Sequence, residues 1–95
     1  MINDDQKTTS LDLAQIREDI DSVDQQIQQL INRRAKLAEA VAKAKFASEE
    51  NPLFYRPERE AQVLRKVMER NEGPLSDQTM ARLFREIMSA CLALE

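Results

Sequence analysis

Any chemistry in this chain must come from arginine, lysine, aspartate and glutamate side chains. The sequence has no histidine and only one cysteine, Cys91. Histidine-based acid–base catalysis, most metal sites and a disulfide within the chain are therefore excluded. Cys91 lies in an apolar helical stretch, where an unreactive thiol is expected. The informative positions are those at which a charged residue interrupts an apolar helical pattern.

Arg34 is the first such interruption. Apolar residues recur in alternating three- and four-residue steps over residues 13–44, and Arg34 occupies the position expected to be apolar between Leu30 and Leu37. Lys45 follows eleven residues later, on the same helical face and about 16 Å further along the axis. Two cations at this separation can hold opposite ends of a small dianion. Arg34 alone could instead set the register of a helix pair, or extend its charged end into solvent.

Glu95 is a second interruption. It follows Phe84, Met88 and Cys91 by helical steps, so its carboxyl group should point along their apolar stripe. A carboxyl group in such a place is expected to be protonated or paired. The alternative is a frayed chain end with the carboxylate in water.

Three other charged residues have weaker arguments from spacing. Arg59 and Glu60 open the second predicted helix, where surface ion pairing is the usual outcome. Arg17 is about 25 Å from Arg34 along the first helix, too far for one small ligand in the same chain. An antiparallel partner helix would instead bring Arg17 toward the other chain's residues 34–45. Solvated or ion-paired charges are expected at Arg33, Arg65, Arg70, Arg82 and Arg85.

The elements that position these residues are predicted to be helices alone. One glycine, three prolines and abundant Ala, Leu, Glu, Gln, Arg and Lys favour an all-α fold. Asn51-Pro52 and Gly73-Pro74 interrupt the helical patterns. No stop signal follows Leu94, so the chain either ends in a helix or was cut from a longer polypeptide. We predict a flexible tail over 1–10, a domain over 11–95, and helices at about 11–46, 57–71 and 76–95.

Oligomerisation and location follow from size and composition. The apolar stripe of the first helix is longer than either of the two other predicted helices, so the rest of the chain cannot cover it. This predicts that the first helix packs on a second copy of the chain. The net charge of −3 and pI near 5 argue against a general nucleic-acid binder. No apolar run approaches the roughly 20 residues of a membrane span, and the polar start lacks a signal peptide. A cytoplasmic homodimer is expected.

The chain contains several short motifs, which are Ile16-Arg17-x-x-Ile20-Asp21-x-x-Asp24, Arg34 before Leu37-Ala38, Val41-x-Lys43-x-Lys45, Pro57-x-Arg59-Glu60 and Arg82-Leu83-Phe84. In this order and spacing they resemble the AroQ-class chorismate mutases over about residues 11–95. The resemblance implies an intertwined homodimer of three-helix protomers that converts chorismate to prephenate without a metal or cofactor, in phenylalanine and tyrosine biosynthesis. Residues 88–95 also resemble the end of the N-terminal mutase domain of bifunctional chorismate mutase–prephenate dehydratases.

The resemblance assigns the principal site residues. Arg34 of one chain and Arg17 of the other would bind the two substrate carboxylates. Lys45 would donate to the ether oxygen of the breaking bond. Glu95 stands where other members carry Gln or Glu, and it would act beside Lys45.

The resemblance also assigns the edge of the site. Glu60 and the backbone at Arg56 would hold the ring hydroxyl, while Arg59 would brace the site. Arg56 falls where many members have Asp, so an acidic contact to the hydroxyl is expected to be missing. Cys91 falls where some members have Ser, and its thiol is a weaker donor.

Two alternatives remain at this stage. An isochorismate pyruvate lyase resembles this family in fold and cationic site. A non-catalytic helical dimerisation module would use Arg34 only to set register. That module explains the long first helix, but not Lys45, Glu60 and Glu95 together.

Overall fold

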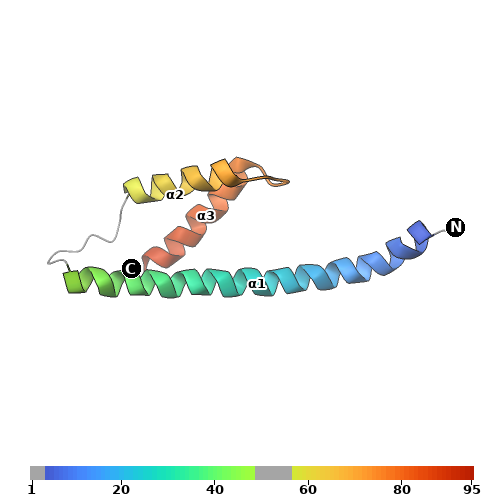
Figure 1. The fold of residues 1–95 in the computed structure, drawn as a ribbon, viewed down its shortest axis with the longest axis horizontal. Helices are drawn as coiled ribbons and strands as arrows, with labels where there is room; N and C mark the ends of the chain where they lie inside the picture. The colour runs from blue at the N-terminus through green and yellow to red at the C-terminus, as the bar shows by residue number, and fades with distance from the viewer. Residues whose placement is uncertain (1–3, 49–56) are drawn as a thin grey trace. The chain divides into compact units, whose positions relative to one another are not determined.

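The computed structural model describes residues 4–48 and 57–95, which form three helices and their connections (Figure 1). The helices are α1, Asp4–Ser48, α2, Pro57–Arg70, and α3, Asp77–Leu92. No strand occurs among these described residues, and the predicted all-α class is confirmed. None of the helices in this part of the chain is long and apolar enough to cross a membrane.

Helix α1 is longer than predicted at its start. It begins at Asp4, so residues 4–10, which we expected in a flexible tail, are helical. The physical reason is the lack of a stop signal, since neither proline nor glycine precedes Leu11. Its end at Ser48 lies two residues beyond the predicted one. The breaker Asn51-Pro52 lies outside the described residues.

The chain divides into two compact units, Met1–Asn32 and Arg33–Glu95. In its described residues the first unit is a single stretch of α1, so no other element of that unit can cover its apolar side chains. These side chains are 48% to 60% exposed. They are Leu13, Ile16, Ile20, Val23, Ile27 and Leu30. Such a stripe is typical of a helix that packs against another chain.

The second unit contains a helical hairpin, in which α2 and α3 contact each other. Its core is small. Leu64 and Val67 from α2 are buried, and Ala81 and Cys91 from α3 are each only 2% exposed. Pro57 opens α2 as predicted, because a proline lacks only an N–H that the first helical turn leaves unpaired.

The loop of the hairpin spans residues 71–76. Asn71 donates from Nδ2 to the carbonyl oxygen of Leu75 and to Oδ1 of Asp77, both at 2.8 Å, so one side chain joins the end of α2 to the start of α3. Gly73 has a φ of 79°, a left-handed conformation that favours glycine.

Helix α3 begins as the sequence predicts. Ser76 is its N-cap, in an extended conformation, and its side-chain oxygen accepts a 3.1 Å hydrogen bond from the backbone N–H of Thr79. This bond satisfies one of the N–H groups that the first turn leaves without a partner.

Candidate active site

Helix α1 carries the two predicted cations, Arg34 and Lys45, in the second unit. Both side chains are half-buried, whereas the neighbouring Lys36 and Lys43 are exposed. The helix is uninterrupted between Arg34 and Lys45, so eleven residues separate them by about 16 Å along the axis and by almost three turns. Arg34 and Lys45 therefore differ from Lys36 and Lys43 in that their side chains are partly buried.

Ala38 lies between the two cations on the same face. It follows Arg34 by four residues and precedes Lys45 by seven, and it is only 7% exposed. An alanine contributes only a single methyl group, so at this position the helix places little bulk between the two long side chains. The covered face thus has a cation at each end and a small apolar residue in between.

Glu60 lies at the start of α2 on the buried stripe of that helix. It precedes Leu64 by four residues and Val67 by seven, and its side chain is half-buried. The neighbouring Arg59 is exposed, and its Nη1 donates to Oε1 of Gln62 at 3.0 Å. Arg56, predicted to contribute a backbone group, lies outside the described residues.

The end of α3 differs from its predicted form. The helix ends at Leu92 rather than at Glu95. The N–H of Leu94 donates to the carbonyl oxygen of Cys91 at 2.9 Å, and that of Glu95 to the carbonyl oxygen of Leu92 at 3.1 Å. These three-residue bonds tighten the last turn because the final carbonyl groups of a helix otherwise have no backbone partner.

Glu95 is nevertheless half-buried, so its side chain is not fully exposed as at a frayed end. Cys91 is a free thiol and is buried. Arg17, in the first unit, is exposed. The structure thus shows half-buried polar side chains on α1, on α2 and just after the end of α3 in the second unit, and an exposed arginine in the first unit.

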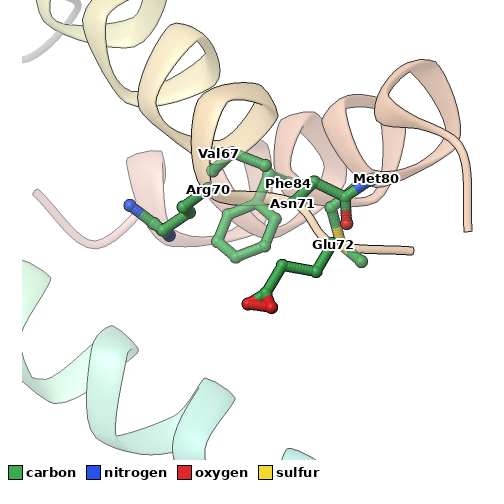
Figure 2. Close-up of a pocket in the computed structure, with 6 residues that line it drawn as sticks. All are labelled: Val67, Arg70, Asn71, Glu72, Met80 and Phe84. Atoms are coloured by element: carbon green, nitrogen blue, oxygen red, sulfur yellow. The ribbon is translucent and has the colours of Figure 1, made fainter. Parts of the chain in front are cut away.

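A separate pocket of about 270 Å³ lies at the loop end of the α2–α3 hairpin (Figure 2). Phe84 and Met80 form its apolar part, and the figure shows the Glu72 carboxylate and Arg70 guanidinium beside them. None of its lining residues was predicted as a site residue, and Arg70 was expected to be solvated. A dianion would meet the Glu72 carboxylate here, so this pocket does not suit the ligand that Arg34 and Lys45 suit.

The described residues form one long helix, with two cations on a covered face, and a two-helix hairpin. A family model for chorismate mutase type II matches residues 16–95, and the chain belongs to this family.

Named relatives and a solved structure agree with this assignment. The chain is 57% identical over 86 residues to a bifunctional chorismate mutase/prephenate dehydratase of Stutzerimonas stutzeri, and 52% identical over 86 residues to one of Pseudomonas aeruginosa. Each match covers 87% of this chain but 24% of the relative, so the chain spans about a quarter of the length of these relatives. The structure of chorismate mutase (form II) from Thermus thermophilus matches with a TM-score of 0.80 at 29% identity, over 86% of this chain and 91% of that one.

Proposed function

We propose that this chain is a chorismate mutase that converts chorismate to prephenate. Membership of the family supports the proposal. The structural observation that carries it is the pair of half-buried cations, Arg34 and Lys45, at the two ends of one covered face of α1. Their separation suits a small substrate with negative charge at more than one place.

The proposed reaction is a unimolecular rearrangement, so the site needs neither a nucleophile nor a base. The ether C–O bond breaks as a new C–C bond forms, and no proton is transferred. The protein must hold chorismate in its compact diaxial form and stabilise the negative charge that grows on the ether oxygen. In the proposal Arg34 binds a carboxylate, while the Lys45 ammonium donates to the ether oxygen.

Glu95 completes the contacts to the ether oxygen. A protonated carboxyl group can donate to that oxygen, whereas a carboxylate would repel the charge that grows there. The half-buried position of Glu95 supports this role because the side chain is partly withdrawn from water.

The remaining site residues act at the edge of the substrate. Glu60, half-buried on the stripe of α2, accepts from the ring hydroxyl, which the backbone at Arg56 also contacts. Arg59 braces the site, and its bond to Gln62 holds the guanidinium along α2. Cys91 serves as a weak donor or as an apolar wall.

The proposed working form is a homodimer, in which Arg17 reaches the partner's site. The half-exposed apolar stripe of α1 supports a second copy as the covering partner. Arg17 is exposed in a unit whose described residues offer no second helix, which supports a partner chain as the source of the rest of the site around it.

The testing experiment is incubation of the purified chain with chorismate and, separately, with isochorismate. Formation of prephenate from chorismate is expected. Salicylate and pyruvate from isochorismate would assign the lyase reaction instead. A dimer that turns over neither substrate would indicate a helical dimerisation module.

A further inference from the structure

The pocket at the loop end of the α2–α3 hairpin lies within one pair of contacting helices. Its volume of about 270 Å³ is somewhat below the range of pockets that hold drug-sized molecules, so it suits a small ligand. Val67, Met80 and Phe84 give the pocket an apolar wall, and these side chains are buried or half-buried. None of them is proposed to contact chorismate, so the pocket is separate from the candidate active site.

Two opposite charges stand beside this apolar wall. Arg70 is the last residue of α2 and Glu72 follows two residues later, and both side chains line the pocket and are exposed. Figure 2 shows the guanidinium and the carboxylate apart from each other, beside the Phe84 ring. Among the side chains that the structure describes, neither of these two forms an ion pair. Both charges are therefore open to a ligand.

The backbone around Glu72 adds to this arrangement in two ways. The last carbonyl groups of α2 have no partners within the helix and carry the negative end of its dipole, so an ammonium group beside Glu72 is favoured there. Asn71, which also lines the pocket, donates to the carbonyl oxygen of Leu75 and to Oδ1 of Asp77, both at 2.8 Å. These bonds hold the loop that carries Glu72 in place before a ligand arrives, which lowers the entropy cost of binding.

We propose that this pocket binds a free α-amino acid with an apolar side chain. The carboxylate of the ligand pairs with the Arg70 guanidinium, its ammonium group pairs with the Glu72 carboxylate, and its side chain packs on Met80 and Phe84. A zwitterion matches both charges of the pocket. An anion alone would leave the Glu72 carboxylate unmatched, and a cation alone would leave the guanidinium unmatched, so each should bind less well.

The test is titration of the whole chain with L-leucine, followed through the NMR chemical shifts of the backbone amides. The dissociation constant should be about 1 mM or below, and the shift changes should centre on the residues that line the pocket. Three fragments of the ligand are compared with it. Isocaproate lacks the ammonium group, isoamylamine lacks the carboxylate, and glycine lacks the apolar side chain. Each fragment should bind about tenfold or more weakly than L-leucine.

Two variants separate the contribution of each charge. Glu72→Gln should weaken the binding of L-leucine about tenfold but should not weaken that of isocaproate, which has no ammonium group to lose a partner. Arg70→Gln should weaken the binding of both L-leucine and isocaproate, but not that of isoamylamine. A general change of the fold would weaken all of these ligands alike, so the pattern identifies direct contacts.

Glu69→Gln and Arg65→Gln are the matched controls, because they remove the same charges from exposed positions of α2 that do not line the pocket. Both should bind L-leucine as the parent does. The inference would be overturned by no binding, which is also the result if a second copy covers the pocket, by shift changes centred elsewhere, or by equal binding of L-leucine and its fragments. Binding is measured without chorismate, so its failure is distinct from failure of the parent to convert chorismate.

Discussion

Replacement of Lys45 by glutamine removes a charge from the covered face of α1 and keeps a polar side chain there. The half-buried ammonium is proposed to donate to an oxygen that gains negative charge only as the bond breaks. The lost interaction therefore belongs mainly to the transition state, and kcat should fall much more than KM rises.

The size of the effect follows from the environment of Lys45. Loss of one donor to a developing oxyanion costs about 3 to 4 kcal/mol, or a hundredfold to a thousandfold in kcat. Partial burial favours the upper part of this range, because less water is available to replace the ammonium. Since the ether oxygen of the bound substrate is neutral, KM should change less than about threefold.

Lys43→Gln is the matched control. It removes the same charge two residues earlier, from an exposed position almost on the opposite side of the helix. Initial rates of chorismate loss across a range of concentrations give kcat and KM for the parent and both variants, and thermal unfolding checks that the fold is retained. A Lys45→Gln variant with unchanged kcat and raised KM would refute the assigned role, as would an equal loss of kcat in Lys43→Gln.

Four other outcomes are expected. Arg17→Ala and Arg34→Ala should each be nearly inactive, but refolding the two variants together should recover about a quarter of the parent activity, because half of randomly formed dimers would contain one intact site. No recovery despite detectable heterodimers would show that Arg17 does not cross the interface. Glu95→Gln should remain active, because an amide can donate to the ether oxygen as a protonated carboxyl group would, whereas Glu95→Ala should lose most of its kcat; equal kcat values for these two variants would remove Glu95 from the mechanism. In thermal and denaturant unfolding, Val67→Ala should lower the free energy of unfolding by about 2 kcal/mol, since Val67 is 2% exposed. Ser76→Ala should lower it by about 1 kcal/mol through loss of the N-cap bond, and an unchanged stability would contradict that assignment.

Features that depend on neighbouring residues were predictable from the sequence. The all-α class, the three helices, the first residue of α2 and the Ser76 cap all follow from propensity, periodicity and local hydrogen bonding. The apolar stripe of α1 was equally predictable, because a helix of regular period fixes which residues share a face. The family resemblance rested on such spacings, and the match over residues 16–95 supports it.

Helix ends were less predictable because several weak effects compete there. Helix α1 begins at Asp4 rather than near Leu11, and α3 closes at Leu92 with a tightened turn rather than continuing to Glu95. Neither change is marked by glycine or proline, so the sequence contains no local signal for it.

Burial depends on tertiary structure, and it separates residues of the same type. Lys43 and Lys45 are residues of the same type, two positions apart, yet Lys43 is exposed and Lys45 is half-buried. Periodicity places the two side chains on different faces, but only packing decides which face is covered. By itself the sequence determined which charged residues interrupt the apolar patterns. The tertiary structure decided which of them are partly removed from water, because desolvation depends on atoms contributed by segments distant in the chain.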